Sequence, residues 1–112
     1  MTIIDKPWGF EELIEVNNNY VLKKLFMKKG HRCSLQYHNL KHETIYVLEG
    51  VLKVQVAQGD GAYEEILLNS GQSLVVTVGQ VHRMEGVSDC YYLEASTPEL
   101  DDVVRVSDDY GR

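Results

Sequence analysis

The sequence of 112 residues predicts an all-β protein built from short antiparallel strands. Apolar and polar residues alternate with a period of two through most of the chain, which is typical of half-buried strands. Glycines and polar turn residues separate these segments, and no sustained period of 3.6 residues indicates a helix. Seven or eight short strands at this spacing are typical of an antiparallel sandwich or barrel.

The clearest strand covers residues 51–56, where Leu52, Val54 and Val56 fall on one face and polar residues fall on the other. A polar turn at residues 58–61 follows, as expected between antiparallel neighbours. Only residues 98–104 favour a short helical or irregular segment, because proline is common in the first turn of a helix. Further strands are expected at residues 20–28, 32–38, 44–48, 63–68, 73–78, 81–85 and 90–95.

Composition limits the classes of function. The length suits one packed core, so residues 1–112 are expected to form a single domain. The net charge is −6, with 17 acidic against 11 basic residues, which argues against nucleic-acid binding. No apolar run approaches the roughly 20 residues that span a bilayer, and the start does not resemble a secretory leader. We therefore expect a cytoplasmic protein without nucleic-acid or membrane partners.

The chain contains two cysteines, Cys33 and Cys90. Two cysteines are too few for a disulfide framework, and sequence alone does not indicate that they pair. We expect two buried or half-buried thiols.

Potential metal ligands gather in one part of the sequence. Residues two apart on a strand project from the same face, and the loop at residues 39–42 lets the chain turn back toward them. A further histidine follows a turn at residues 79–81. Imidazole, carboxylate and amide groups suit a divalent transition metal, and four such ligands leave positions open for substrate. The four candidate ligands are Gln36, His38, Glu43 and His82.

Histidines in strands also occur as surface or hydrogen-bonded core residues, so the spacing alone leaves a metal site and a structural interpretation about equally favoured. His31 follows a glycine turn and His42 lies in the loop beside Glu43. Neither shares the same-face register of Gln36 and His38. We interpret His31 and His42 as structural or exposed.

The same residues resemble the two motifs of the cupin superfamily. In the first motif Gln36 stands where histidine is usual, and in the second Thr77 stands where proline is commoner. The first motif runs through Gly30, Gln36, His38, Glu43 and Gly50, and the second through Gly71, Thr77, Gly79 and His82. This resemblance implies a single jelly-roll β-barrel with a divalent metal at Gln36, His38, Glu43 and His82, with Zn expected and Mn, Co, Ni or Fe as alternatives.

Three further segments are similar to the cupin domain of type II phosphomannose isomerases. They are KPWGF at residues 6–10, SLQYH at residues 34–38, and the terminal motifs DVVR and DDYGR at residues 102–105 and 108–112. Those isomerases usually carry this domain behind a mannose-1-phosphate guanylyltransferase. No glycine-rich nucleotide-binding loop occurs here, so this chain alone is not expected to transfer nucleotides. The resemblance also implies a homodimer.

The resemblance implies isomerisation of mannose 6-phosphate to fructose 6-phosphate through a cis-enediolate, with the metal as Lewis acid. Lys23 and Arg105 resemble family residues and are candidates for binding the anionic substrate. For each, a structural role as a rim lysine or in a salt bridge is about equally favoured. Glu94 could face inward as the general base, although a surface carboxylate is the commoner case.

One departure from the family keeps other functions open. The family continues with His-His-Arg-x-Glu-His, whereas this chain has Asn39, Leu40 and Lys41 before Glu43. Arginine and lysine are not interchangeable where a planar fork holds phosphate. The main alternative is a non-catalytic metal- and carbohydrate-binding cupin of a sugar-nucleotide pathway. A metal-dependent dioxygenase is a third hypothesis, against which Gln36 argues mildly because such enzymes use more histidines.

Overall fold

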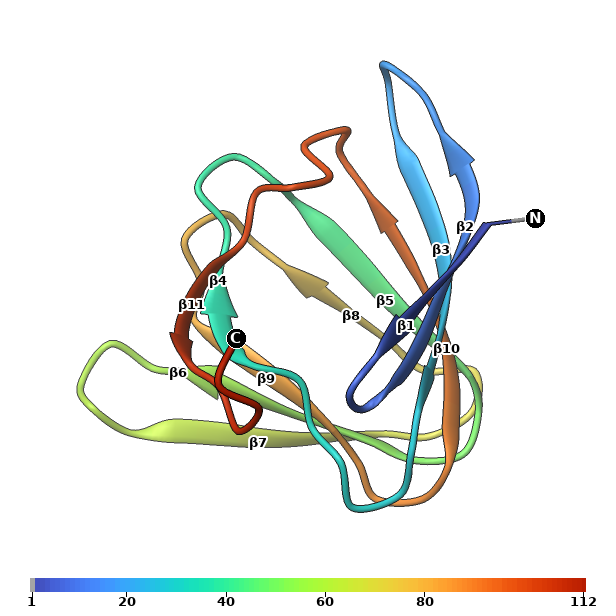
Figure 1. The fold of residues 1–112 in the computed structure, drawn as a ribbon. Coiled ribbons are helices and arrows are strands. Elements are labelled where there is room, and N and C mark those ends of the chain that lie inside the picture. The colour runs from blue at the N-terminus through green and yellow to red at the C-terminus, as the bar shows by residue number, and fades with distance from the viewer. Residues whose placement is uncertain (1) are drawn as a thin grey trace.

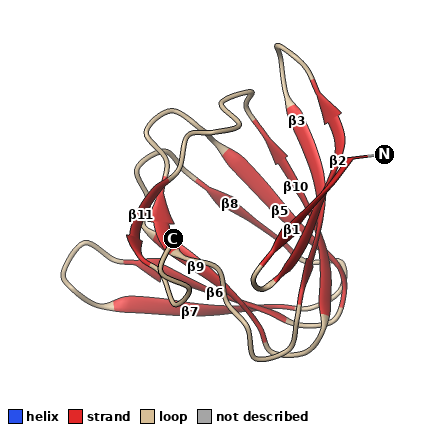
Figure 2. Ribbon diagram, in the orientation of Figure 1, coloured by secondary structure: helices blue, strands red, loops and turns tan. Residues whose placement is uncertain are grey.

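The computed structural model describes residues 2–112, which form eleven strands and no helix. Figure 2 shows this all-strand architecture, which confirms the predicted fold class. No helix of these residues is thus long and apolar enough to cross a bilayer. The strands are β1 (Thr2–Lys6), β2 (Gly9–Val16), β3 (Val21–Met27), β4 (Leu35–Tyr37), β5 (Glu43–Glu49), β6 (Leu52–Ala57), β7 (Tyr63–Leu68), β8 (Ser73–Val76), β9 (His82–Gly86), β10 (Cys90–Ser96) and β11 (Val104–Ser107).

Two antiparallel sheets face each other and enclose the interior (Figure 1). One sheet has six strands in the order β1-β2-β3-β10-β5-β8, and the other has five in the order β11-β4-β9-β6-β7. β1 and β2 lie at one edge of the six-stranded sheet, and β11 lies at one edge of the five-stranded sheet. The N-terminal and C-terminal segments therefore flank the opening between the two sheets.

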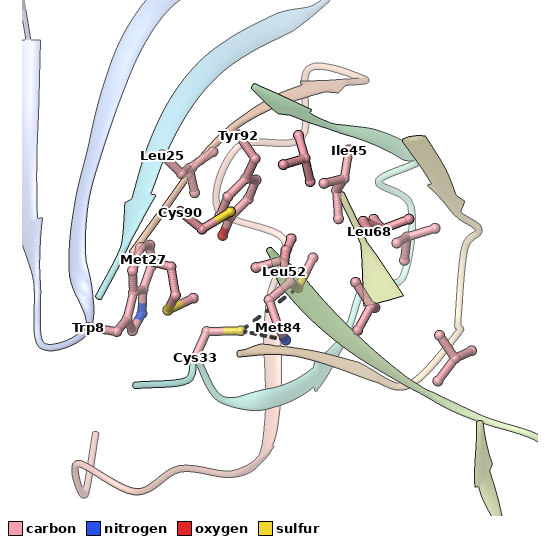
Figure 3. Close-up of a cluster of buried hydrophobic side chains, with 14 residues drawn as sticks. Trp8, Leu25, Met27, Cys33, Ile45, Leu52, Leu68, Met84, Cys90 and Tyr92 are labelled. Atoms are coloured by element: carbon pink, nitrogen blue, oxygen red, sulfur yellow. Dashed lines mark hydrogen bonds between the residues drawn. The ribbon is translucent and has the colours of Figure 1, made fainter. Parts of the chain in front are cut away.

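The interior has an apolar end and a polar end, because three strands of the six-stranded sheet change character along their length. In β3 and β10 the antiparallel register pairs Met27 with Cys90 and Leu25 with Tyr92, and then Lys23 with Glu94. Glu43 begins β5 beside this polar pair. The apolar end forms one cluster around Trp8, Leu25, Met27 and Tyr92 (Figure 3). Functional groups are thus confined to one end of the interior.

Both cysteines are free and buried, as expected. Cys33 and Met84 lie within the apolar cluster, where their sulfur atoms are 3.9 Å apart (Figure 3). Burial raises the pKa of Cys33 to about 11 and that of Cys90 to about 11. Both thiols are therefore protonated near neutral pH, which makes them poor nucleophiles and poor metal ligands.

Three strands were missed from the sequence, namely β1, β2 and β11. β1 lies at a sheet edge with Ile3 and Ile4 both exposed, so its apolar residues do not alternate. The strand expected at residues 32–38 is shorter and covers only β4, with Arg32 in an isolated bridge to Glu85. Residues 98–103 are irregular rather than helical. Edge strands and short strands lack the half-buried pattern that makes a strand predictable.

Candidate metal centre

Two histidines and one glutamate meet at the polar end of the interior. His38 directly follows β4, Glu43 begins β5, and His82 begins β9. Their metal-binding atoms all lie within 4.8 Å of one another, and all three side chains are buried. Glu43 Oε1 is 3.4 Å from His38 Nε2 and 3.3 Å from His82 Nε2. The two sheets therefore bring His82 to His38 and Glu43, from which it is far apart in sequence.

Backbone carbonyl groups orient both imidazole rings. His38 Nδ1 lies 2.6 Å from the carbonyl oxygen of Asp102, and His82 Nδ1 lies 2.8 Å from that of Gln80. Carbonyl oxygen only accepts, so each Nδ1 carries a proton, and Nε2 is the ring nitrogen that each histidine can offer to a metal. Among residues 2–112 neither Nε2 has a hydrogen-bond partner, and neither does Glu43 Oε1. Buried polar atoms left unpaired in this way fit a divalent metal.

The charge of Glu43 also suits a cation. Burial acts to raise its pKa, but the two imidazoles and the nearby Lys41 ammonium outweigh burial and hold the pKa well below its usual value. Lys41 Nζ lies 3.3 Å from Glu43 Oε2, on the other oxygen from the one that faces the histidines. Lys41 thus fixes one carboxylate oxygen while the other remains available to a metal.

Gln36 is the fourth candidate ligand. In the five-stranded sheet Gln36 is the direct cross-strand partner of His82, so both side chains are on the same face. Its Oε1 accepts a 2.6 Å hydrogen bond from Ser34 Oγ, which orients the amide and leaves one lone pair on that oxygen. Gln36 also lines the inner cavity described below.

A chain of alternating charges runs from the metal centre toward the opening. Lys41 lies between Glu43 and Glu94, and the Lys41 Nζ is 3.6 Å from Glu94 Oε2. Lys23 then links Glu94, at 3.8 Å, to Glu11, at 3.3 Å. From the sequence Lys41 stands out only as a departure from a family pattern, because it lies in the loop before β5, where no alternation predicts the direction of a side chain.

Glu94 faces inward and is only 7% exposed, so it is not the surface carboxylate that the sequence also allowed. Burial, together with the negative charge of Glu43, raises the pKa of Glu94 to about 7 against the opposing effects of Lys41 and Lys23. Lys23 is also buried, and its ammonium is committed to two carboxylates. Of the two predicted anion-binding residues, only Arg105 lacks an ionic partner among residues 2–112.

Two neighbouring hollows share several lining side chains, and Gln36 is the only one of the four candidate ligands that lines either of them. An inner cavity of about 70 Å³ lies among Gln36, Lys41, Glu94, Trp8 and Tyr92. A wider outer hollow of about 320 Å³ opens beyond it. Side chains that line both hollows include Lys6, Glu11, Lys23 and Arg105. His31 and His42 are exposed and lie outside the metal-binding group.

Asp102 fixes the loop that precedes Glu43. Its carboxylate accepts backbone hydrogen bonds from Asn39 at 3.1 Å, Leu40 at 2.6 Å and Lys41 at 2.9 Å. These bonds hold the pKa of Asp102 below its usual value. Because its own carbonyl also orients His38, one residue from the C-terminal part of the chain positions the loop and a candidate ligand.

Replacing Asp102 by alanine is expected to weaken metal binding by about 10-fold or more, since residues that orient ligands typically contribute this much. The fold should persist, because the strands do not depend on this carboxylate. Asp101→Ala is the control, since Asp101 lies in the same segment, whereas the three backbone bonds to the loop go to Asp102. Competition with a chelator measures both affinities, and equal affinities in the two variants would show that the loop needs no anchor.

Comparison with known proteins places the chain in a family. The family model described as mannose-6-phosphate isomerase C-terminal matches residues 2–108. The chain belongs to this family. Mannose-1-phosphate guanylyltransferase of Escherichia coli K12 is 33% identical over 112 residues, covering 96% of this chain and 22% of that protein. Xanthan biosynthesis protein XanB of Xanthomonas campestris pv. campestris strain B100 is 31% identical, covering 96% and 23%.

This member of the mannose-6-phosphate isomerase C-terminal family therefore spans less than a quarter of these curated relatives. Solved structures share its fold at low identity. Oxalate decarboxylase of Bacillus subtilis has a TM-score of 0.82 at 14% identity, over 94% of this chain and 30% of that one. KdgF of Halomonas sp. has a TM-score of 0.75 at 15% identity, over 90% and 91%. The predicted cupin fold is confirmed.

Proposed function

We propose that this protein is a cytoplasmic, metal-dependent sugar-phosphate isomerase of the type that converts mannose 6-phosphate to fructose 6-phosphate. The observation that carries the proposal is the buried meeting of His38, Glu43 and His82, whose unpaired atoms lie together beside Lys41, a residue that lines the inner cavity. The family of the chain supports a sugar phosphate as substrate.

A divalent metal fits the three unpaired donors, with Gln36 as the fourth ligand and Zn expected ahead of Mn, Co, Ni or Fe. When bound, such a metal supplies Lewis-acid polarisation of the substrate's carbonyl and hydroxyl oxygens. The chain itself orients the donors through the carbonyl groups of Asp102 and Gln80. Trp8 and Tyr92 contribute aromatic side chains to the wall of the inner cavity.

Isomerisation moves a proton from C2 to C1 of the open-chain sugar, while the proton on O2 passes to O1. Glu94 is the candidate base because it is buried, lines the inner cavity and lies one lysine away from the metal ligands. Lys23 and Lys41 hold its carboxylate from two sides. The Lys41 ammonium also adds positive charge where negative charge develops on the reacting oxygens.

The test is direct. Purified protein is incubated with mannose 6-phosphate and added Zn, Mn, Co, Ni or Fe(II), and fructose 6-phosphate is assayed. Glu94→Gln should lower kcat by about 10²- to 10⁴-fold, the usual range for a general base. Glu12→Gln is the matched control, because Glu12 lies on the outer face opposite Lys24. Absence of fructose 6-phosphate under every metal would refute the isomerase.

His38, His82 and Glu43 by themselves also fit the dioxygenase, the third hypothesis, although Gln36 as a fourth ligand argues mildly against it. Two histidines and one carboxylate with open positions are typical of non-haem Fe(II) oxygenases. Oxygen consumption by the Fe(II)-loaded protein in the presence of a candidate organic substrate would support this alternative. If the Fe(II)-loaded protein takes up no oxygen in this measurement, the dioxygenase hypothesis is refuted.

The replacement of the family arginine by Lys41 favours the second alternative, a non-catalytic module that binds metal and carbohydrate in a sugar-nucleotide pathway. Lys41 is occupied by Glu43 and Glu94 and offers no planar fork to phosphate. Binding of a sugar or sugar phosphate without turnover under any metal would support the module. Turnover that depends on Glu94 would exclude it.

We also propose that the protein is a homodimer that pairs through the outer face of its six-stranded sheet. This outer apolar face contains Leu22, Phe26, Tyr91, Leu93, Tyr46 and Val75, which alternate with the inward residues. By contrast, the outer face of the five-stranded sheet presents polar residues such as Lys53, Gln55 and Glu65. Six strands at about 4.8 Å and seven residues at about 3.4 Å give roughly 690 Å² of flat area, comparable to one side of a standard interface.

Light scattering tests the homodimer. The wild-type protein should have the mass of a dimer, and Tyr46→Glu should have the mass of a monomer because the charge lies within the outer apolar face. Leu67→Glu is the control, since Leu67 is 56% exposed on the other sheet and should leave the dimer intact. A monomeric wild type would overturn the proposal, as would equal masses for the two variants.

A further inference from the structure

Tyr92 is a buried polar side chain that the isomerisation described above does not use. It is 2% exposed and lines the inner cavity. Its ring packs in the apolar cluster, and Figure 3 shows it projecting from β10 into the interior. Among residues 2–112 its hydroxyl forms no hydrogen bond. Buried tyrosine hydroxyls usually have a partner, so this one is available to a ligand in the cavity.

The Tyr92 hydroxyl keeps its proton and can donate it in a hydrogen bond. Burial is the main cause that holds the pKa of Tyr92 well above its usual value, with smaller contributions from Cys33 and Glu94. The two carboxylates that line the same cavity face a lysine instead of the hydroxyl, since Lys23 Nζ is 3.8 Å from Glu94 Oε2 and 3.3 Å from Glu11 Oε2. The proton of Tyr92 is therefore left for a ligand.

Tyr92 faces the same space as the candidate base. Tyr92 and Glu94 are two residues apart on β10, where inward residues alternate with outward ones, so both side chains lie on the inner face of this strand. Gln36 and Lys41 line the same cavity, whose volume of about 70 Å³ is less than a quarter of that of the outer hollow at about 320 Å³. A ligand that reaches Glu94 in this small cavity therefore also meets the Tyr92 hydroxyl.

We propose that the Tyr92 hydroxyl donates a hydrogen bond to one oxygen at the reacting end of the sugar, O1, O2 or O3, and selects for ligands that carry this oxygen. The inference rests on the proposed function, because C1 and C2 are then the part of the sugar that lies beside Glu94. A ligand without this oxygen leaves a buried donor unpaired, and a site of this kind discriminates strongly against such a ligand. Tyr92 thereby determines specificity, and Glu94 remains the candidate base.

Mannitol 6-phosphate is the probe that tests this role, because it has the hydroxyl groups of the open-chain sugar but no carbonyl and cannot isomerise. Its 1-deoxy, 2-deoxy and 3-deoxy derivatives each lack one oxygen of the reacting end. Calorimetric titration of the Zn-loaded full chain measures how much each missing oxygen weakens binding. Tyr92→Phe should bind mannitol 6-phosphate about 10-fold more weakly than the wild type, the usual effect of losing a buried hydrogen bond.

For one of the three derivatives, the further loss of affinity should be about 10-fold smaller in Tyr92→Phe than in the wild type, because the bond to that oxygen is already gone. Tyr63→Phe is the matched control and should keep the wild-type affinities, because Tyr63 is 48% exposed on β7 and lines neither hollow. The same losses in the wild type and in Tyr92→Phe for all three derivatives would overturn the inference. Failure of the wild type to bind mannitol 6-phosphate would overturn it as well.

Metal content and circular dichroism should be unchanged in Tyr92→Phe, and a loss of metal would show that Tyr92 supports the metal centre instead of the ligand. The titration involves no turnover, so the inference stands if no fructose 6-phosphate forms and the losses still differ as expected. Turnover by the wild type, together with the same losses in the wild type and in Tyr92→Phe, would refute the inference alone.

Discussion

Replacing His38 or His82 by alanine is expected to lower the bound metal from about one ion per chain to almost none, because a site with three strong donors does not hold a divalent ion on two. Both imidazoles are buried with Nε2 unpaired, and no other histidine joins their group. His31→Ala and His42→Ala should keep the metal, since both side chains are exposed. Elemental analysis after dialysis, alongside circular dichroism to confirm folding, measures all four variants.

Equal loss of metal in all four variants would mean that the donors are not those that the register brings together. Gln36→Ala provides a graded case. A neutral amide oxygen is a weaker donor than imidazole, so this variant should retain metal at reduced affinity while the histidine variants do not.

Replacing Lys41 by methionine is expected to lower the free energy of unfolding of the metal-free protein by about 3 to 5 kcal/mol, the usual cost of removing one partner from a buried ion pair. Lys41 is 3% exposed and bridges two buried carboxylates, Glu43 and Glu94. Methionine keeps the length of the side chain and removes the charge, which leaves two acids facing each other. Urea unfolding measures the change.

Lys53→Met is the matched control, because Lys53 also lies between two glutamates, Glu65 and Glu85, but at the surface. Its loss should cost at most about 1 kcal/mol. Adding Glu94→Gln to Lys41→Met should restore part of the stability, since one of the unpaired charges is gone. A Lys41→Met protein as stable as the wild type would show that the two carboxylates do not depend on the ammonium.

The sequence was sufficient for the fold class, and it singled out as candidate metal ligands His38, Glu43 and His82, which the structure brings together. Alternation made most strands visible, and the two-residue spacing of Gln36 and His38 predicted that they share a face. In the structure Gln36 pairs across the sheet with His82, and His38 directly follows the strand of Gln36. The sequence was not sufficient for the charges around these residues. Ion pairing depends on which residues of distant strands face each other, and only the pairing of β3 with β10 brings Lys23 to Glu94.

Lys6 shows the same limit from the other side. It belongs to a motif that was noticed from the sequence, yet its place in the lining of both hollows did not follow, because β1 lies at a sheet edge and has no alternation to fix its orientation. Glu94 was left open between surface and interior for a related reason. Glu94 lies on β10, which has β3 on one side and β5 on the other. Which face of such a strand is buried depends on its neighbours, and the sequence does not show which strands these are.

The division of the interior into an apolar and a polar end has a consequence for how this scaffold can change. β3, β5 and β10 each supply residues to both ends of the interior. Within each of these strands, one part packs the apolar core and the other part carries the polar and charged side chains. Substitutions at sites that far apart act nearly independently on stability. New side chains such as Asn39, Leu40 and Lys41 can therefore alter the chemistry of this barrel without requiring a new core.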